Sequence, residues 1–257
     1  MRVGKTIVIT GAAGGIGRAI TRNLALIDDA WTRESMFFLC DCSEKFQDGG
    51  FQAFLKEAER KAFLRLMGAE ASVEQNVSLI LESTGKIDVL INAAGVLQKP
   101  APLIKTDSEE VIRVFSVNFL TTFEWIKAVL PIMRERGYGR IVNFSSVMGS
   151  RGDAGNAIYA ASKAALESLT KTLALEAPFN KNGHPFDITV NAVAPGIIDT
   201  SMTAGLPEAA WAEYKKRVPF HRKGAPEEVA EAVRFLITSS QFINGMILPV
   251  DGGYLAS

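Results

Sequence analysis

The sequence predicts an α/β protein with a doubly wound, mostly parallel sheet of seven strands and helices on both faces. Short apolar segments alternate with longer segments of helical period, which is the pattern of strands joined by helical crossovers. The short segments are rich in Val, Ile, Leu and Phe and lack polar alternation, as expected for parallel strands covered on both faces. We expect strands at Thr6–Thr10, Met36–Asp41, Phe63–Met67, Val89–Asn92, Ile141–Ser145, Ile188–Val193 and Met246–Val250.

Two of the connecting segments show clear helical faces. The first repeats apolar residues on one face, at Ile16, Ile20, Leu24 and Ile27. The last does the same behind a proline and two glutamates that are typical of a helix start, with apolar residues at Val229, Val233 and Leu236. No repeat, low-complexity linker or composition break interrupts the chain, so we expect residues 1–257 to form a single domain.

Composition and charge argue against several classes of protein. The 28 basic residues balance the 28 acidic ones and are spread along the chain, unlike the positive surface of a nucleic-acid-binding protein. No segment approaches the ~20 apolar residues of a membrane-spanning helix. An apolar strand begins close behind Met1, which leaves no room for a signal peptide and predicts a cytoplasmic protein.

The chain has two cysteines, Cys40 and Cys42, on either side of Asp41. Neighbours at that spacing on one strand do not readily close a disulfide, and two thiols alone do not make a metal site. We therefore expect free thiols in a reducing compartment and no bound metal.

A glycine-rich turn joins the first predicted strand to the helix that follows it. Residues 10–17 read TGAAGGIG, a Gly-x-x-x-Gly-x-Gly pattern. Backbone without side chains lets a pyrophosphate approach closely, and the helix N-terminus offers free N–H groups and the positive end of its dipole. Glycines in a tight turn can also be purely structural, but dinucleotides bind at this place in doubly wound folds. The candidate cofactor-binding residues here are Gly11, Ala13, Gly15, Ile16 and Gly17.

The second predicted strand ends in Asp41, and Cys42 follows it as a further candidate for cofactor contact. A carboxylate there can accept hydrogen bonds from both adenosine ribose hydroxyls and repels a 2′-phosphate, although an ordinary turn aspartate would look the same. No Lys or Arg occupies positions 12–14 or directly follows Asp41, so the sequence favours NAD over NADP. Lys45 or Arg60 could still turn toward a phosphate.

A tyrosine and a lysine share one face of a predicted helix. Tyr159 and Lys163 lie at i and i+4 in YAASKAAL, so their side chains project from the same side. A free tyrosine titrates near pH ~10, and a nearby ammonium lowers that pKa until the phenol becomes a usable acid and base. The alternative is an ordinary surface pair. Ser146 argues against it, because it lies at the end of a strand, where the ligand crevice opens, and can bond a substrate oxygen. Ser145 is the weaker candidate because side chains alternate along a strand.

Together these motifs resemble the short-chain dehydrogenase/reductase family. They follow in the family's order and spacing, from the first strand to Asp251-Gly252-Gly253: residues 10–17, Asn92-Ala93-Ala94-Gly95, Asn118, Ser146, residues 159–163 and Pro195-Gly196. The resemblance implies a Rossmann fold and hydride transfer between nicotinamide and a carbonyl or alcohol carbon, with Tyr159 exchanging a proton with the oxygen. It also implies that Lys163 bonds the nicotinamide ribose, and that Asn118 holds a water linking Lys163 to solvent.

The resemblance implies further cofactor contacts. It places one group along the adenosine ribose, namely Asn92, Ala93, Ala94 and Gly95. It places a second group beside the nicotinamide, namely Pro195, Gly196, Ile198 and Thr200. Ile198 would cover the ring and Thr200 would bond its carboxamide or a phosphate. The family more often has a second Asn where Ala93 stands. It also has an acid after the third strand to hold the adenine. Here the nearest acid is Glu70, which leaves the adenine contact unassigned.

Substrate information is thinner. We expect residues 202–220 to cover the pocket, with an apolar face made by Leu206, Trp211, Tyr214 and Val218. This face indicates an apolar or mid-sized substrate, or only a lid that buries its own apolar side chains. The loop before Tyr159 carries polar residues that either recognise a substrate or remain solvated, namely Arg151, Asp153 and Asn156.

The sequence therefore favours an enzyme acting on a small carbonyl or alcohol substrate. Within the family, 3-oxoacyl carrier-protein reductases and sugar, polyol or alcohol dehydrogenases remain alternatives. A nicotinamide-binding sensor or structural protein without turnover is the other class, but such a protein would be expected to lose Tyr159, Lys163 or Ser146. The resemblance also implies a homotetramer, in agreement with apolar residues on more than one side of the helix from Tyr159, at Ala161, Ala165, Leu169, Leu173 and Leu175.

Overall fold

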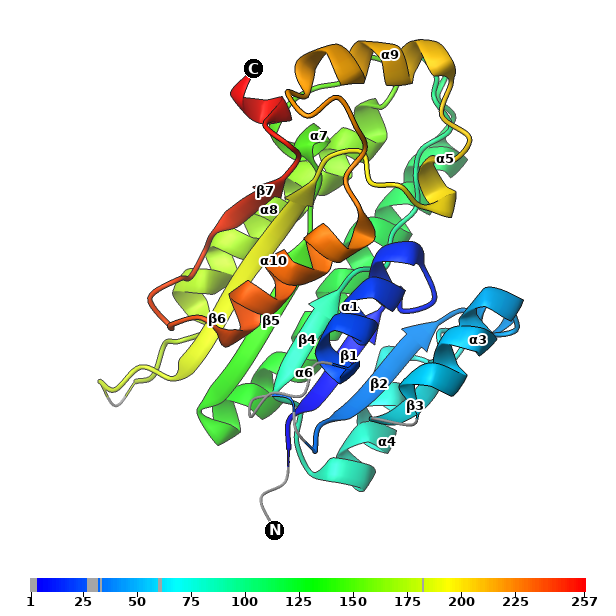
Figure 1. Ribbon diagram of the computed structural model, residues 1–257. Helices are drawn as coiled ribbons and strands as arrows, with labels where there is room; N and C mark the ends of the chain where they lie inside the picture. Colours follow the sequence, from blue (N-terminus) through cyan, green and yellow to red (C-terminus); the bar gives the residue numbers. More distant parts are fainter. Residues whose placement is uncertain (1–3, 27–31, 33, 60–61, 182) are drawn as a thin grey trace.

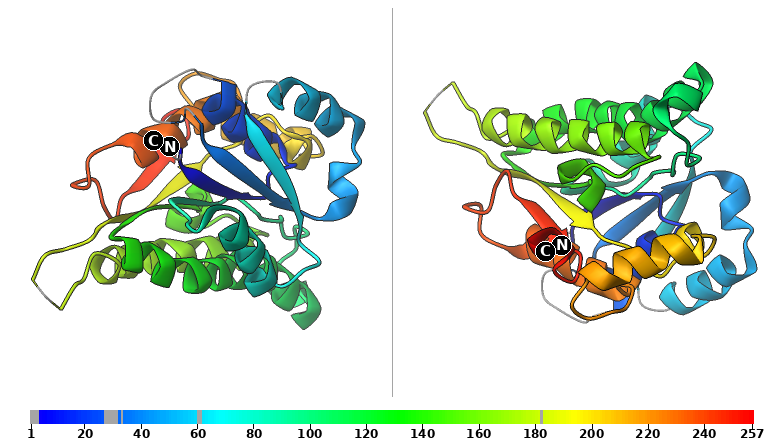
Figure 2. Two further views of the ribbon diagram at one scale, coloured as in Figure 1. Left: turned by 90° about the horizontal axis from the view of Figure 1, so that it is seen from below. Right: turned by 90° about the horizontal axis from the view of Figure 1, so that it is seen from above.

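The computed structural model describes residues 4–26, 32, 34–59, 62–181 and 183–257. It shows a seven-stranded sheet between two layers of helices (Figure 1, Figure 2). The strand order is β3-β2-β1-β4-β5-β6-β7, and each neighbouring pair is parallel. The chain thus starts in the middle of the sheet, runs outward to β3, and crosses back to β4. This confirms the predicted doubly wound fold.

The strands lie at β1 (Thr6–Thr10), β2 (Met36–Asp41), β3 (Phe63–Gly68), β4 (Val89–Asn92), β5 (Tyr138–Phe144), β6 (Asp187–Pro195) and β7 (Ile247–Val250). The α-helices are α1 (Gly15–Leu26), α2 (Ser43–Phe46), α3 (Gly49–Ala58), α4 (Val73–Thr84), α5 (Ser108–Phe115), α6 (Thr121–Arg136), α7 (Val147–Ser150), α8 (Ala157–Glu176), α9 (Glu208–Arg217) and α10 (Pro226–Thr238). Short turns complete the set: 3-10 turns η1 (Leu103–Lys105), η3 (Ser201–Thr203) and η4 (Tyr254–Ala256), and a π-helical turn η2 (Ser116–Leu120).

The predicted strands are all present, and β5 differs most in its bounds. It begins at Tyr138 and ends before Ser145. Tyr138 and Arg140 near its start carry polar side chains, and the Arg140 guanidinium lies 2.9 Å from the Asp187 carboxylate of β6. Apolar periodicity could not detect this part of the strand, because ladder hydrogen bonds and an ion pair hold it instead of apolar packing.

Alternate residues of each central strand pack against opposite helical layers. Ile7 and Ile9 of β1 belong to one core cluster with α1, α3 and α10. Val8 belongs to the other cluster, with α4, α6 and α8. All three side chains are fully buried. Burial on both faces explains why the strands lack polar alternation.

The helix starts follow the capping signals in the sequence. At α10, Pro226 is the first helical residue and the Glu228 carboxylate accepts the Ala225 N–H at 2.7 Å. At α4, Ser72 Oγ accepts the Gln75 N–H at 3.2 Å while Gln75 Oε1 accepts the Ser72 N–H at 2.9 Å. These reciprocal bonds satisfy N–H groups that have no partner inside the helix.

The carboxyl ends of the parallel strands meet at one edge of the sheet. Helices α7 and α9 and the C-terminal turn lie beyond that edge, at the top of Figure 1. Among the described residues, no helix is both long and apolar enough to cross a membrane. The fold therefore positions the strand ends that carry the candidate site residues under a cover of short helices.

Candidate active site

A cleft opens at the carboxyl ends of the strands, and three groups of residues line it. Residues next to the glycine turn and the ends of β4 and β6 form one side, including Ile16, Ala93, Gly95, Pro195, Gly196, Ile198 and Thr200. The polar residues are Ser146, Tyr159 and Lys163. Apolar and aromatic residues form the remaining wall, including Val96, Leu97, Met148, Met202, Leu206, Tyr214 and Tyr254.

The glycine turn is a bare backbone cradle at the start of α1. Gly11 has a φ of 66°, and a Cβ there would lie 2.7 Å from the Ala93 carbonyl group. A Cβ on Gly17 would overlap the Gly11 carbonyl oxygen, and one on Gly15 would lie 2.8 Å from the Thr200 methyl carbon. Helix α1 begins at Gly15, so its first N–H groups have no partners within the helix. This arrangement fits a pyrophosphate.

Asp41 ends β2 beside that turn. Its Oδ2 accepts the Ala13 N–H at 3.1 Å and its Oδ1 accepts the Cys42 N–H at 2.9 Å. Helix α2 also brings the Lys45 ammonium to 2.9 Å from Oδ1. The sequence analysis left Lys45 open as a cation that could turn toward a 2′-phosphate, and in the structure Lys45 pairs with Asp41, because α2 places residue i+4 beside the carboxylate. Arg60, the other cation considered, lies outside the described residues.

Glu70 stands at the same corner of the sheet. Its carboxylate accepts the Ser43 N–H at 2.8 Å and the Ser43 hydroxyl at 2.7 Å. These hydrogen bonds lower the pKa of Glu70. Because Asp41 of β2 pairs with Gly68 of β3, Glu70 lies close to the end of β2. The nearest acid after β3 is thus fixed by Ser43, immediately beyond Cys42.

Three polar side chains meet in the cleft, one from the loop after β5 and two from α8. Ser146 Oγ accepts the Met148 N–H at 3.2 Å, and its hydroxyl is near enough to Tyr159 to favour the phenolate. Lys163 Nζ donates to the Phe144 carbonyl oxygen at 2.8 Å and lies 5.7 Å from the centroid of the Tyr159 ring. Helix α8 therefore presents Tyr159 and Lys163 on one face, as the i, i+4 spacing predicts, and Ser146 joins them.

Ser145 has a different set of partners. Its Oγ donates to Glu167 Oε1 of α8 at 2.8 Å, and Ser150 Oγ donates to the same oxygen at 3.0 Å. Glu167 is buried, and a Cβ on Gly149 would lie 2.7 Å from its Oε1. Ser145 thus ties the loop after β5 to α8, whereas its neighbour Ser146 serves the cleft.

Burial sets the protonation of the tyrosine and the lysine. It raises the pKa of Tyr159, and the hydrogen bond with Ser146 only partly opposes this. Burial lowers the pKa of Lys163 to about 8. In the protein alone, burial thus places the Tyr159 pKa above its usual value, opposite to the direction expected from a nearby ammonium. At neutral pH Tyr159 is a neutral phenol that can donate a proton.

Asn118 lies on the π-helical turn η2 and is fully buried. Its Oδ1 accepts the Val96 N–H at 2.8 Å, while Nδ2 donates to the Val96 carbonyl and to Ser162 Oγ, both at 3.1 Å. A Cβ on Gly95 would lie 3.4 Å from Asn118 Oδ1 and 3.5 Å from Lys163 Nζ. Asn118 and Lys163 thus converge on the bare backbone of Gly95, and π-helical turns often mark functional sites.

Comparison with known proteins assigns the chain to a family. The model of the family described as enoyl-(acyl carrier protein) reductase matches residues 11–255. The chain is 36% identical over 256 residues to the 3-oxoacyl-[acyl-carrier-protein] reductase FabG of Thermotoga maritima, covering 97% of each. Its structure is similar to levodione reductase, with a TM-score of 0.86, 32% identity and 98% of each chain covered. The chain belongs to the short-chain dehydrogenase/reductase family.

Membership makes the protein an NAD(P)-dependent oxidoreductase acting on carbonyl or alcohol groups. Similar solved structures of the family include both cofactor forms. ElxO with NADP bound matches with a TM-score of 0.84 and 27% identity, covering 99% of this chain and 100% of that one. NAD⁺-bound xylitol dehydrogenase matches with a TM-score of 0.81 and 28% identity, covering 98% and 100%.

The residues of the motif 92–95 at the end of β4 have two roles: one links strands, and the others line the cleft. Asn92 is buried, and its Nδ2 donates to Asn143 Oδ1 of β5 at 3.0 Å, so its side chain holds two strands together. Ala93 and Gly95 line the cleft, and the Ala94 N–H donates to the Thr10 hydroxyl at 3.2 Å. The backbone of this segment, rather than the Asn92 amide, is available to a cofactor.

The segment after β6 closes the cofactor side of the cleft. Ile198 is almost fully buried and forms a short bridge with Gly224. The Ile197 N–H donates to Tyr214 Oη of α9 at 2.9 Å. The Tyr214 ring stacks on Tyr254 with centroids 4.6 Å apart. The predicted cover thus contributes Tyr214 to the cleft, whereas Val218 is buried behind it.

Sequence reasoning missed part of the substrate-side wall. Val96, Leu97 and Tyr254 line it. Gln98 was missed as well, although it is buried and bonds the start of α8. No local pattern marks these positions. Their role follows from where the segment after Gly95 runs in space.

Proposed function

We propose that this oxidoreductase interconverts a carbonyl compound and a secondary alcohol with Tyr159 as the acid/base and Ser146, Lys163 and Asn118 as its partners. The observation that carries this proposal is the meeting of Ser146, Tyr159 and Lys163 in one cleft beside a backbone cradle for a dinucleotide. When bound, the nicotinamide ring supplies or accepts the hydride. The protein's own residues bind the substrate oxygen and handle the proton.

The proton transfer follows from the positions of the two hydroxyl groups. Ser146 and Tyr159 both line the cleft, so a substrate oxygen bound between their hydroxyls can accept a hydrogen bond from each. In reduction, Tyr159 gives its phenolic proton to that oxygen while the carbon takes the hydride. In oxidation, the tyrosinate takes the proton back. The buried site strengthens these interactions and excludes competing water.

We propose that Lys163 links the Tyr159 phenol to the cofactor ribose and to a path for protons. Its ammonium has donors left after the bond to the Phe144 carbonyl, and these can reach nicotinamide ribose hydroxyls. With the pKa of Lys163 lowered to about 8, this group can pass on a proton near neutral pH. We propose that Asn118 holds a water beside Lys163 and so completes a path to solvent, as the shared approach to Gly95 supports.

We propose NAD(H) as the preferred cofactor. Asp41 carries this choice, because two backbone N–H groups hold its carboxylate beside the glycine turn, where it could accept hydrogen bonds from the adenosine ribose hydroxyls. A 2′-phosphate there would face a like charge. Lys45 weakens the repulsion, but its side chain is 53% exposed and so strongly screened. We propose Glu70, which Ser43 holds at the same corner, as the residue that faces the adenine.

The substrate class proposed is a mid-sized, mainly apolar carbonyl compound. The wall opposite the cofactor side is made by aliphatic, thioether and aromatic side chains, among them Leu97, Met148, Leu206 and Tyr254. Arg151 at the mouth lies with its guanidinium carbon 5.4 Å from the centroid of the Tyr254 ring, so a polar end of the substrate can remain near it. Similar proteins are named as reductases of 3-oxoacyl-[acyl-carrier-protein] and of levodione.

We also propose a homotetramer in the cytoplasm. Exposed apolar side chains on α6, on α8 and just beyond it support self-association, including Phe123, Leu175 and Phe179. Light scattering at micromolar concentration should give a tetramer mass, and a monomer mass would contradict this. Cys40 and Cys42 are both free, in keeping with a reducing compartment.

The experiment that tests the function is a turnover screen. A panel of ketones and alcohols is mixed with each of NAD⁺, NADH, NADP⁺ and NADPH, and the nicotinamide absorbance is followed. We expect turnover of apolar ketones with NADH, which falls strongly in Ser146→Ala. Tight cofactor binding without turnover of any pair would instead support a sensor or structural protein.

A further inference from the structure

Helix α8 carries Tyr159 in its first turn, yet its own first residues do not cap it. The N-cap residue Asn156 makes no side-chain hydrogen bond to the helix. Its Nδ2 donates instead to Asp153 Oδ2 at 2.6 Å. The N–H groups of the second and third helical residues, Ile158 and Tyr159, therefore need an acceptor from elsewhere.

Gln98 supplies that acceptor from the loop after β4. Its Oε1 accepts the Ile158 N–H at 2.8 Å and the Tyr159 N–H at 3.1 Å. Its Nε2 donates to the Gly155 carbonyl oxygen at 3.0 Å, and only 2% of the residue is exposed. One buried side chain thus fixes the backbone at both ends of the junction that leads into α8.

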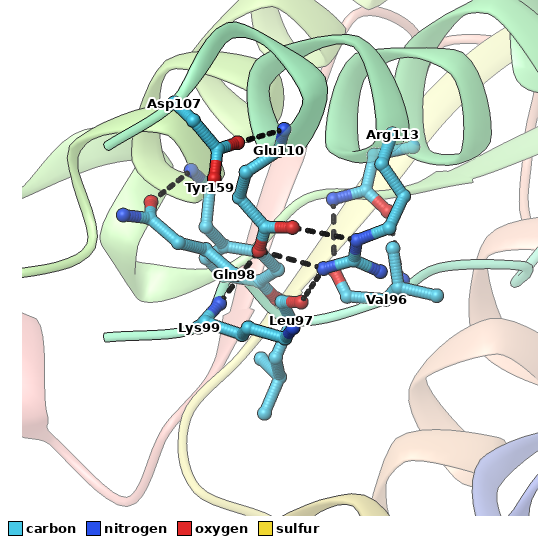
Figure 3. A network of polar contacts seen from close by, with 9 residues as sticks. Val96, Leu97, Gln98, Lys99, Asp107, Glu110, Arg113 and Tyr159 are labelled. Carbon is cyan, nitrogen blue, oxygen red and sulfur yellow. Dashed lines mark hydrogen bonds and ion pairs between the residues drawn. The ribbon is translucent and has the colours of Figure 1, made fainter. Parts of the chain in front are cut away.

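The backbone around Gln98 is itself fastened on both sides (Figure 3). The Glu110 carboxylate accepts the Lys99 N–H at 2.7 Å, and the Arg113 guanidinium donates to the Leu97 carbonyl oxygen at 2.7 Å. Arg113 and Glu110 also pair with each other through two bonds of 2.7 and 2.8 Å, which lower the pKa of Glu110 to about 2. Arg113 and Glu110 of α5 therefore hold the backbone on both sides of Gln98 through hydrogen bonds.

We propose that Gln98 is a positioning residue for the reaction: it caps α8 across the fold and so holds Tyr159 in register with Ser146. Val96, two residues earlier, is bonded through its backbone to Asn118. The segment 96–98 therefore contacts both Asn118 and Tyr159, the two ends of the proposed proton path. Rigid placement of the phenol matters because a shift of about 1 Å can cost roughly 100-fold in rate. The proposal rests on the proposed role of Tyr159.

The test compares three glutamine variants and one reference variant. Gln98→Met keeps the length of the side chain and removes both polar functions. Gln98→Glu keeps an oxygen acceptor for the two N–H groups and suits a helix N-terminus. Gln75→Met removes a comparable capping bond from α4, which carries none of the catalytic group. Tyr159→Phe is measured in parallel. For each protein, kcat, the dissociation constant of the cofactor and the thermal unfolding midpoint are determined.

We expect Gln98→Met to lower kcat by about 10- to 100-fold while cofactor binding stays unchanged. Gln98→Glu should recover most of the loss, and Gln75→Met should affect only the unfolding midpoint. Normal kcat in Gln98→Met, or equal kcat in the Met and Glu variants, would overturn the capping role. If Gln98→Met does not fold, Glu110→Gln decides, because a kcat equal to wild type there would also overturn it. Turnover in Tyr159→Phe would instead remove the proposed function itself.

Discussion

Cofactor preference can be worked out from the surroundings of Asp41. In NADP the 2′-phosphate would lie where the Asp41 carboxylate accepts the N–H groups of Ala13 and Cys42. Two like charges about 4 Å apart repel by roughly 4 kcal/mol at the effective dielectric constant of a protein surface. Lys45 lies 2.9 Å from the carboxylate but is 53% exposed. Such an exposed cation offsets about 1 kcal/mol at most.

The remaining repulsion predicts a clear preference. We expect kcat/KM to favour NAD(H) over NADP(H) by at least ~10-fold, which corresponds to about 1.4 kcal/mol. Asp41→Ser should shrink this ratio, mainly by weakening NAD(H), because the ribose hydroxyls lose a charged acceptor. Lys45→Ala should widen it, because the repulsion then acts without a neighbouring cation.

The assay is steady-state kinetics with both cofactors on one substrate. Glu44→Gln is the matched control, because it removes an exposed carboxylate from α2, the helix of Lys45, without touching Asp41. It should leave the ratio of kcat/KM for the two cofactors unchanged. An NADP(H) preference in the unmodified protein would refute the reasoning. A ratio that stays constant in Asp41→Ser would show that another group selects the cofactor.

Three further predictions concern stability and binding. Because burial lowers the pKa of Lys163 to about 8 from 10.5, folding disfavours its charged form, and the wild type gains stability as pH rises between these values. Lys163→Met should therefore be more stable than wild type by about 1–3 kcal/mol near pH 7 in denaturant titrations, and the difference should vanish above pH ~10.5. A constant difference across that range would contradict this. Gly17→Ala should abolish cofactor binding by calorimetry, because its Cβ overlaps the backbone, whereas Gly49→Ala, with open space around it, should bind normally. Glu167→Ala should lower the free energy of unfolding by about 1 kcal/mol because it removes the acceptor of the Ser145 and Ser150 hydroxyls, and Glu167→Gln should lose less; equal losses would argue against this hydrogen-bond role.

Apolar patterning was sufficient to predict the sheet and its helical crossovers. Strands β1, β2, β4, β5 and β6 are buried on both faces, so their continuous apolar runs are direct consequences of the layer architecture. Apolar patterning did not predict the start of β5 at Tyr138, because an ion pair and backbone ladder hydrogen bonds replace apolar packing there. Local signals also placed the start of α10 at Pro226.

The site was predictable where short motifs carry the chemistry and not where distant segments meet. Tyr159 and Lys163 follow from their helical spacing, since four residues return to the same face. The contact of Lys45 with Asp41 depends on a short helix that the sequence did not reveal. Gln98 lies 61 residues from Tyr159 along the chain, so only the fold brings its amide to the N-terminus of α8.

The acid/base role of Tyr159 is tested most directly by removing its hydroxyl. Tyr159→Phe keeps the ring and the packing of α8, and Tyr138→Phe at the opposite end of the sheet provides the matched control. We predict a fall in kcat of ~10²–10⁴-fold for Tyr159→Phe, with unchanged cofactor affinity, and normal turnover for Tyr138→Phe. Near-normal turnover in Tyr159→Phe would contradict the assignment.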